Sequence, residues 1–332
     1  MATLNIADRV EVQVLVDNVT DSLSTNPANV ESERPSLLRA GLTEQAGENI
    51  CCAHFGLSLV VTAYSNGTQH TVLFDAGPEG YAIERNGTLL GVNFGTIEGV
   101  VLSHGHWDHA GGLTRALELI RAHNDGRAVP YYMHPGMFRQ RGARLPNGEV
   151  LPHKPIPSVD LLTTGGATVT SSSEPQLFLD DLFYVSEEIP RITPYELGMS
   201  PTHLRRTVDG TDWEHDQWIM DERCMVMHVR NKGLVVLTAC SHAGVVNVLT
   251  HARATFPDVP LYAVMGGLHL SGAGPEKVIP DTVQGLTEFE LQMIVPAHCT
   301  GWRAVVALVN TFGEEVVAPA AVGKRYTFDA GA

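Results

Sequence analysis

Three histidines and one aspartate lie within six residues of this chain, in the run Ser-His-Gly-His-Trp-Asp-His-Ala-Gly-Gly at 103–112. Imidazole nitrogens and carboxylate oxygens are ligands that zinc, manganese and iron all accept. A polar loop that holds several histidines by chance is the alternative, but four ligand-type side chains between small residues argue against it. The spacing of His104, His106, Asp108 and His109 therefore predicts a metal-binding loop with room for two adjacent ions.

Apolar runs that end in polar residues must position this loop. The run 99–102 predicts a strand that ends at His104, and the run 71–77 predicts an earlier strand that ends at Asp75. The second half of the chain repeats the pattern, with strands expected at 234–242 and 293–298. Both halves thus end with a histidine at a strand terminus, and His298 becomes a candidate late ligand; a histidine held in a turn is the alternative.

The His-x-His-x-Asp-His spacing resembles the metal-binding motif of the metallo-β-lactamase superfamily. The resemblance implies an α/β fold, a four-layer αββα sandwich made of two similar halves whose strand ends meet at the metals. It also implies that His104 and His106 bind at one site and Asp108 and His109 at a second, with His298 as the late ligand of the second site. Asp75 resembles the family's first acid, which orients a metal-bound histidine.

The remaining ligands stay open at this stage. The family usually adds a third histidine at the first site and an aspartate that bridges both metals, but no acid ends the strand at Cys240. A thiolate is a good ligand for a borderline-soft ion, so Cys240 could take the bridging position. His242 lies two residues further on and is the candidate third histidine. A buried, inert thiol is the alternative for Cys240.

Further segments resemble one branch of the superfamily, labelled 7,8-dihydropterin-6-methyl-4-(β-D-ribofuranosyl)-aminobenzene-5′-phosphate synthase. The resemblance spans about Val10 to Phe328, and Ala53 stands where an acid is expected. It implies a transferase that joins a dihydropterin methyl group to a phosphorylated ribosyl aniline. The matching positions are 55–58, 102–106, 238–247, 266–270 and 296–301, together with Asp17, Asn18 and His54.

Composition favours a single domain over residues 1–332. No linker rich in Gly, Ser or Pro separates the two halves, and 44% hydrophobic residues suffice for a core. Five cysteines without a framework spacing indicate reduced thiols. Because the start lacks a signal-like pattern and no run is apolar enough to span a bilayer, we expect a cytoplasmic protein. The net charge of −15 disfavours nucleic acid and membrane surfaces as partners; the oligomeric state is left open.

Hydrophobic periodicity predicts the main elements. Val10, Val12, Val14 and Val16 recur with period two, as in a half-buried strand, and further strands are expected at 57–63 and 70–74. Apolar residues at helical spacing predict a helix at 113–123, beside the metal loop. More helices are expected at 244–255, 280–292 and 301–312. Residues 130–221, rich in Pro, Thr, Gly and Ser, are expected to form an inserted cap that selects the substrate.

Several residues are candidates for substrate contacts. Trp213 and Trp218 could stack on a flat ring, although such aromatics are more often core anchors. His269, which follows Gly266 and Gly267, could donate a proton or contact substrate, and a structural role is equally compatible. Basic side chains in and after the cap could bind phosphate or carboxylate, with ordinary surface charge as the alternative. These are Arg191, His203, Arg205, Arg206, Lys277 and Arg303.

The chemistry most consistent with these residues is attack by a metal-activated water on an ester-like or phosphate-containing small molecule, with two divalent ions, zinc first and manganese or iron as alternatives. Asp108 and His269 are the candidate catalytic residues. No phosphate-binding loop or nucleophile elbow competes, and no organic cofactor is expected. The alternatives are the dihydropterin-linked synthase and a non-catalytic small-molecule sensor. A nuclease is disfavoured by the charge.

Overall fold

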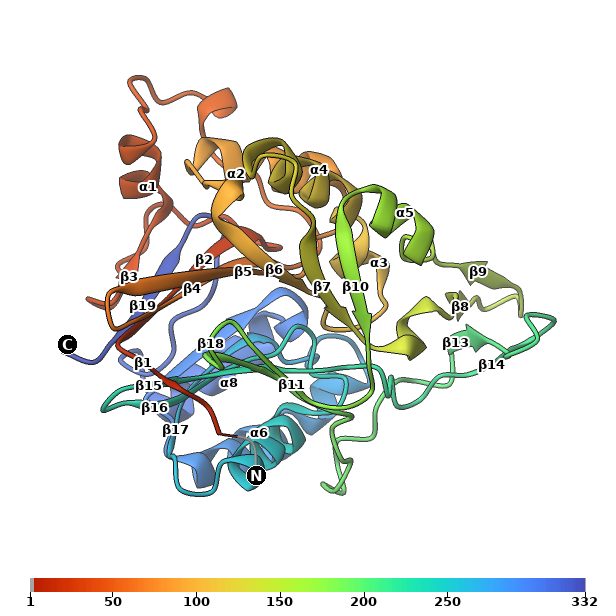
Figure 1. Cartoon of the computed structure of the whole chain (residues 1–332). Helices are drawn as coiled ribbons and strands as arrows, with labels where there is room; N and C mark the ends of the chain where they lie inside the picture. Colours follow the sequence, from red (N-terminus) through yellow and green to blue (C-terminus); the bar gives the residue numbers. More distant parts are fainter. Residues whose placement is uncertain (1–2, 332) are drawn as a thin grey trace.

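Two β-sheets packed face to face, with helices on both outer sides, form the body of the computed structural model, which describes residues 3–331 (Figure 1). The space between the sheets is filled by buried aliphatic and aromatic side chains from both of them. Two further apolar clusters join each sheet to its own helices. The four-layer α/β sandwich expected from the sequence is therefore confirmed.

The first sheet has eight strands within the described residues, in the order β10-β7-β6-β5-β4-β2-β19-β3. Neighbours from β5 to β10 run parallel, so their carboxyl ends meet at one edge. The strands are β2 (Arg9–Val16), β3 (Val30–Glu31), β4 (Ser58–Ser65), β5 (Thr68–Phe74), β6 (Ile97–Val101), β7 (Val129–Met133), β10 (Ala167–Ser171) and β19 (Arg325–Asp329).

The period-two pattern of β2 holds for three of its four valines. Val10, Val12 and Val14 face the other sheet, whereas Val16 packs with the outer helices. The pairing with β4 shifts between Val14 and Val16, and such an irregularity changes the face to which the following side chains point.

The second sheet has the order β11-β12-β15-β16-β17-β18, with β1 beside β15. Its strands β16, β17 and β18 are parallel, and their carboxyl ends face the same edge of the sandwich as those of β5 and β6. The strands are β1 (Ile6–Ala7), β11 (Gln176–Phe178), β12 (Phe183–Val185), β15 (Met225–Val229), β16 (Gly233–Leu237), β17 (Leu261–Gly267) and β18 (Met293–Ala297).

Helices cover the outer face of each sheet because their apolar stripes pack on it. Helices α2, α4 and α5 lie over the first sheet, and α6, α7 and α8 lie over the second (Figure 1). The bounds are α1 (Glu33–Arg39), α2 (Gly80–Leu89), α3 (Trp107–Ala110), α4 (Leu113–His123), α5 (Val159–Thr164), α6 (Val245–Thr255), α7 (Ile279–Leu286) and α8 (Trp302–Phe312). Among the described residues, none of the helices has the length and apolar character needed to cross a membrane.

The expected helix at 280–292 is shorter than its apolar pattern suggests. Helix α7 ends at Leu286, a 3-10 turn follows over Thr287–Phe289, and Glu290 has a left-handed backbone with φ 53°. A left-handed residue stops a right-handed helix, so the helix does not reach Gln292, and β18 begins at Met293. The helices expected at 113–123, 244–255 and 301–312 are present as α4, α6 and α8.

The segment 130–221 contributes to all three sheets of the structure. Its strands β7 and β10 extend the first sheet, and β11 and β12 form the edge of the second. The remaining strands form a separate four-stranded sheet in the order β14-β13-β8-β9, which we call the cap sheet; it lies at one end of the sandwich (Figure 1). Its strands are β8 (Arg141–Arg144), β9 (Val150–Pro152), β13 (His203–Arg206) and β14 (Trp213–His215).

Candidate metal centre

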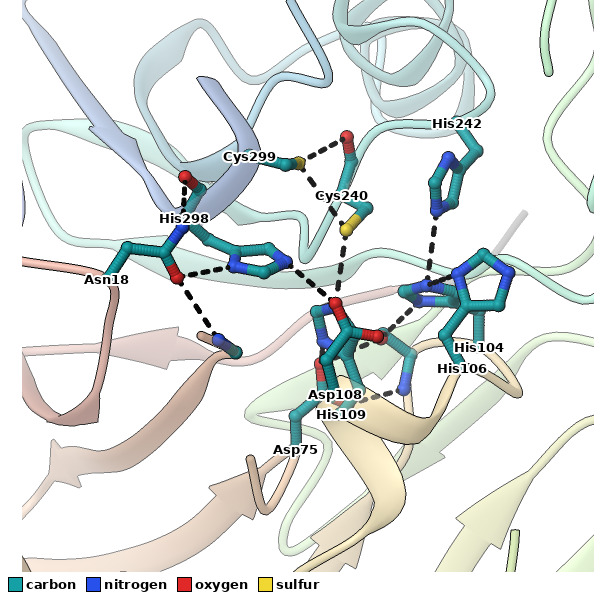
Figure 2. A network of polar contacts seen from close by, with 12 residues as sticks. Asn18, Asp75, His104, His106, Asp108, His109, Cys240, His242, His298 and Cys299 are labelled. Atoms are coloured by element: carbon teal, nitrogen blue, oxygen red, sulfur yellow. Dashed lines mark hydrogen bonds and ion pairs between the residues drawn. The ribbon is translucent and has the colours of Figure 1, made fainter. Parts of the chain in front are cut away.

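Strand ends from both sheets converge on one buried cluster of histidines, an aspartate and two cysteines (Figure 2). At these ends the backbone leaves the strand conformation abruptly. Asp75, Ser241, His269 and His298 all have φ between 45° and 59°, a region that non-glycine residues rarely adopt. Such conformations persist only where the surrounding structure enforces them, and they gather at functional sites.

His104, His106 and His242 form the first cluster of possible ligands. Their ligand atoms all lie within 4.8 Å of one another. Nε2 of His104 is 2.9 Å from Nδ1 of His106 and 3.2 Å from Nε2 of His242. All three side chains are buried. Three imidazole nitrogens therefore point at one position, to which β6 and β16 bring them from opposite sheets.

Asp108, His109 and His298 form the second cluster. Oδ2 of Asp108 lies 3.8 Å from Nε2 of His109 and 3.3 Å from Nε2 of His298. Asp108 and His109 belong to the short helix α3, which begins directly after His106, whereas His298 follows β18. The two clusters are adjacent, because His104, His109 and Cys240 also meet within the same 4.8 Å limit.

Asp75 and Ser103 fix the orientation of one histidine in each cluster. The Asp75 carboxylate accepts hydrogen bonds from the Ser103 hydroxyl and from Nδ1 of His109, both at 2.7 Å. Since Ser103 gives its proton to Asp75, its oxygen accepts the Nδ1 proton of His104 at 2.9 Å. In their neutral forms His104 and His109 are thereby left with a lone pair on Nε2, the atom that faces the clusters.

Asn18 orients His298 in the same way. Its side-chain oxygen is 3.0 Å from Nδ1 of His298, and its amide donates to the His298 backbone carbonyl at 2.9 Å. Nδ1 therefore carries the proton, and Nε2 turns its lone pair towards Asp108. Imidazoles whose outer nitrogen donates to an acceptor and whose inner nitrogen is bare are the usual arrangement around a bound metal. The residues present thus fit a pair of divalent ions.

The pKa values of the histidines in the first cluster also fit metal binding. Burial lowers the pKa values of His104, His106 and His242 well below the ordinary histidine range, and neighbouring cationic groups lower them further. These imidazoles are therefore neutral at pH 7, the form that binds metal.

The second cluster attracts positive charge. Although burial opposes protonation of His109, the carboxylates of Asp108 and Asp75 raise its pKa to about 9. Burial likewise opposes ionisation of Asp108, yet His109 and His298 lower its pKa below the ordinary value. Without a metal, a proton on His109 balances the carboxylates, so a dication has to displace this proton in order to bind.

Two cysteines adjoin the clusters. Sγ of Cys240 is 3.2 Å from Nε2 of His109, and Sγ of Cys299 is 3.4 Å from Sγ of Cys240. Cys240, His298 and Cys299 form a further group of possible ligands. Sequence reasoning missed Cys299; its position directly after His298 was the available signal. All five cysteines of the chain are free thiols in the structure.

A pocket of about 520 Å³ opens beside the first cluster. His242 and His269 form part of its wall, and their rings are 4.4 Å apart. The segment 195–201 and residues after β17 supply most of the remaining lining, including the apolar residues Leu197, Met199, Leu268 and Leu270; His215 and Gln217 also line the pocket. A molecule bound in this pocket would contact His269 and one candidate metal ligand, His242.

Residues 54–195 match the family model described as the metallo-beta-lactamase superfamily. Over this segment, which contains the His-x-His-x-Asp-His loop, the chain is similar to that superfamily. The crystal structure of Tm1679, described as a metal-dependent hydrolase of the beta-lactamase superfamily, has a TM-score of 0.68 at 20% identity and covers 95% of this chain and 98% of its own. Unliganded yeast PDE1 gives a TM-score of 0.53 at 10% identity and covers 98% and 100%. At these sequence identities, both similarities show a shared fold and nothing about activity.

Two proteins of Methanocaldococcus jannaschii are similar in sequence. One is named 7,8-dihydropterin-6-methyl-4-(beta-D-ribofuranosyl)-aminobenzene-5′-phosphate synthase; it is 28% identical over 272 residues, which are 78% of this chain and 85% of that protein. The other is an uncharacterised protein, 27% identical over 249 residues, which are 73% and 84% of the two chains. The chain is thus similar in sequence to a named member of the branch that the motifs suggested.

Within this metallo-β-lactamase fold, the structure separates the two residues that the sequence left as alternatives. His242 joins His104 and His106, whereas Cys240 lies between the clusters near His109. Alternation along the chain after β16 puts both side chains on the site, with Ser241 directed away to the carbonyl of Gly267 at 2.8 Å.

Most of the expected substrate contacts are engaged elsewhere. Arg191 donates to backbone carbonyls of Ile189 and Trp218. Arg205 pairs with Glu214 and Asp216, and Arg206 lies over the ring of Trp213. Arg303 is exposed beside Glu276. Lys277 lies between Pro275 and Val278 of the pocket wall.

His203 behaves differently from the other cap residues. Its Nε2 lies 3.0 Å from Nε2 of His106, so the cap sheet reaches a candidate metal ligand. Burial lowers the pKa of His203 to about 3, and the nearby Arg141 guanidinium adds to this effect. His203 is therefore a neutral imidazole at pH 7.

Two aromatic side chains, Phe55 and Trp107, lie next to the second cluster. The Phe55 ring makes an edge contact with the His298 ring at 4.9 Å and stacks on Trp107 at 6.0 Å. About half of the Phe55 surface is exposed. His54, which also matched the branch, pairs instead with the exposed Glu79.

Proposed function

We propose that this protein is a dinuclear metal-dependent hydrolase that acts on an ester-like or phosphate-containing small molecule. One observation carries the proposal: two triads of ligand atoms, His104-His106-His242 and Asp108-His109-His298, are adjacent and buried, and His242 of the first triad lines a pocket. When bound, divalent ions at these triads supply a Lewis acid and a water whose pKa falls from about 15.7 towards about 7. Zinc is the first ion to test, followed by manganese and iron(II).

Asp108 and His269 are the proposed catalytic residues. Asp108 ionises readily because His109 and His298 lower its pKa, so its carboxylate can accept a hydrogen bond from the attacking water and hold it in position. His269 lies on the pocket wall beside His242, and its pKa is raised: burial opposes protonation, but the Cys299 thiol group favours it. A protonated His269 can give its proton to the leaving group.

We propose that the cap sheet and the segment 195–201 determine substrate specificity. The segment lines the pocket directly, and the cap sheet carries Arg205 and Arg206 on its β13 strand. Loops and small sheets on a rigid scaffold commonly determine specificity.

A dihydropterin-linked synthase is the second candidate, favoured by the similarity to the Methanocaldococcus jannaschii synthase. In this alternative the amine of a ribosyl aniline phosphate would attack the pterin methylene carbon while a diphosphate leaves. The same two triads would then hold cations that neutralise the diphosphate. A non-catalytic sensor is the third candidate.

Metal analysis of protein purified without added metal tests the proposal. We expect close to two equivalents in the wild type, falling towards one in His109→Ala and in His242→Ala. Less than half an equivalent in the wild type, not restored by zinc, manganese or iron(II), would contradict the dinuclear centre. Cys240→Ala tests whether the thiol is required for either ion.

Activity assays then separate the candidates. Hydrolysis of ester or lactone probes that is lost in Asp108→Asn supports the hydrolase. Formation of a coupled product from a dihydropterin methyl diphosphate and a ribosyl aniline phosphate, without ester hydrolysis, supports the synthase. Full metal loading with neither activity favours the sensor.

A further inference from the structure

The outer nitrogen of His106 contacts a histidine of the cap sheet and not one of the main sandwich. Nε2 of His106 and Nε2 of His203 are 3.0 Å apart, and both side chains are more than nine-tenths buried. His203 begins β13, and its backbone is held on both sides, since its N–H donates to Ser200 and its carbonyl accepts from Asp216. The contact thus joins two well-packed elements.

Only one arrangement of protons on this pair leaves the first cluster open to a metal. A neutral imidazole carries a single N–H. If His203 donated, His106 would carry its proton on Nδ1, which points at Nε2 of His104 in the centre of the cluster. If His106 donates from Nε2, its Nδ1 lone pair faces His104 and His242. A neutral His203 with a bare Nε2 therefore favours the metal-binding tautomer of His106.

Other contacts fasten the cap sheet to the same loop. Gly105, between the two histidines, donates its N–H to the Asp221 carboxylate at 2.8 Å. That carboxylate pairs with Arg141 of β8, whose Nε also contacts Asp216 at 2.8 Å. Arg141, Asp216 and Asp221 are all buried. His203 is consequently held against His106 by a network that does not depend on the pair itself.

We propose that His203 is a positioning residue for the first metal: it accepts the Nε2 proton of His106 and so makes the cap sheet part of the metal centre. This inference rests on the proposed dinuclear function. Loss of such a partner of a metal-bound histidine typically weakens metal binding by about 10- to 100-fold. The effect should fall on the cluster of His104, His106 and His242 and leave the second cluster unchanged.

The test is a zinc titration of the full-length protein, in competition with a chromophoric chelator that resolves the two dissociation constants. We compare wild type with His203→Leu, which removes the acceptor, and His203→Gln, whose side-chain oxygen can replace Nε2. His153→Leu is the matched control, because the His153 ring lies 6.1 Å from that of His203 but has no hydrogen bond to His106 in the described structure.

For His203→Leu we expect one zinc to bind about 10- to 100-fold more weakly and the other to keep its affinity. His203→Gln and His153→Leu should stay within about threefold of wild type. In a His242→Ala background, where the first cluster is already impaired, His203→Leu should add little, since the two changes act on the same ion. In the zinc-loaded wild type, ¹⁵N NMR should find the His106 proton on Nε2.

Unchanged zinc affinities in His203→Leu, or a His106 proton on Nδ1, would overturn the inference. So would an equal loss of both ions in the Leu and Gln variants, which would indicate only a structural role for the cap histidine. A wild type that binds no zinc, manganese or iron(II) would instead overturn the proposed function. The two failures are therefore distinguishable.

Discussion

The carboxylate of Asp75 lies 2.7 Å from Nδ1 of His109, and both side chains are fully buried. The same carboxylate takes the hydroxyl proton of Ser103, which in turn contacts His104. A single acid at the end of β5 therefore orients one imidazole in each cluster. Its left-handed backbone, with φ 59°, turns the side chain towards α3.

Replacing this acid should weaken metal binding at one or both clusters. In Asp75→Asn the amide nitrogen replaces one carboxylate oxygen. At Oδ2 it removes the acceptor of both the Ser103 hydroxyl and the His109 Nδ1–H, and at Oδ1 it removes the acceptor of the Ser103 backbone N–H. We expect zinc affinity to fall by about 10- to 100-fold at one or both clusters, measured by chelator competition. Glu98→Gln is the matched control, because Glu98 is a partly exposed carboxylate that also contacts a histidine ring, that of His70. Equal zinc affinities in both variants would contradict the role of Asp75.

We expect Cys240 to influence which divalent ion the site binds more tightly. A thiolate is a soft ligand that favours cadmium over manganese, whereas a hydroxyl has the opposite tendency. We expect Cys240→Ser to weaken cadmium binding by at least about tenfold while manganese binding changes little, as measured by titration of each ion. Cys52→Ser, at a thiol outside the candidate ligand groups, should alter neither. A parallel loss of both ions would mean that Cys240 only packs against His109.

A substitution at Gly244 should lower the free energy of unfolding, because the Glu196 side chain lies against this glycine. It has φ 93°, and an added Cβ would overlap the carboxyl group of Glu196. That carboxylate accepts hydrogen bonds from the Val246 and Asn247 N–H groups at 2.8 and 2.9 Å, at the start of α6.

Gly210 provides the matched control for this steric effect. It has φ 72°, and a methyl group added there would meet open space. We expect Gly210→Ala to cost about 1 kcal/mol of unfolding free energy through backbone strain. Gly244→Ala should cost about 1–3 kcal/mol more, since overpacking is added to the backbone strain at φ 93° and ψ 131°. Urea denaturation measures both, and equal costs would rule out the overlap with Glu196.

Asp17 should make stability depend on pH. It accepts the His298 N–H at 2.7 Å, and burial raises its pKa from 3.8 to about 6. The folded protein therefore binds more protons than the unfolded chain between about pH 4 and pH 6, so the stability contributed by this group is present below about pH 4 and is lost as pH rises through about 6.

The variant Asp17→Asn does not ionise and should avoid this loss. Its unfolding free energy relative to wild type should rise by up to roughly 3 kcal/mol between pH 4 and pH 7 and then level off. Urea denaturation with a chelator present, which keeps cations from His298, measures the difference. Asp258→Asn, at an exposed position, is the control. A difference that does not vary with pH would contradict the role assigned to burial.

Features that depend on short spacing could be predicted from the sequence. The His-x-His-x-Asp-His loop, the apolar strand before it and helix α4 follow from residues within about 25 positions of one another, where periodicity and ligand type are readable. The strand ends at Asp75 and His298 were found in the same way.

Contacts between distant segments became visible only in the folded chain. The fold separated His242 from Cys240, brought Cys299 to the clusters, and set His203 of the cap sheet against His106 across 97 positions of the chain. It also divided residues 130–221 among three sheets. Such contacts depend on strand order and on left-handed turns at strand ends, which have no local periodicity, so the packing of the two halves has to fix them.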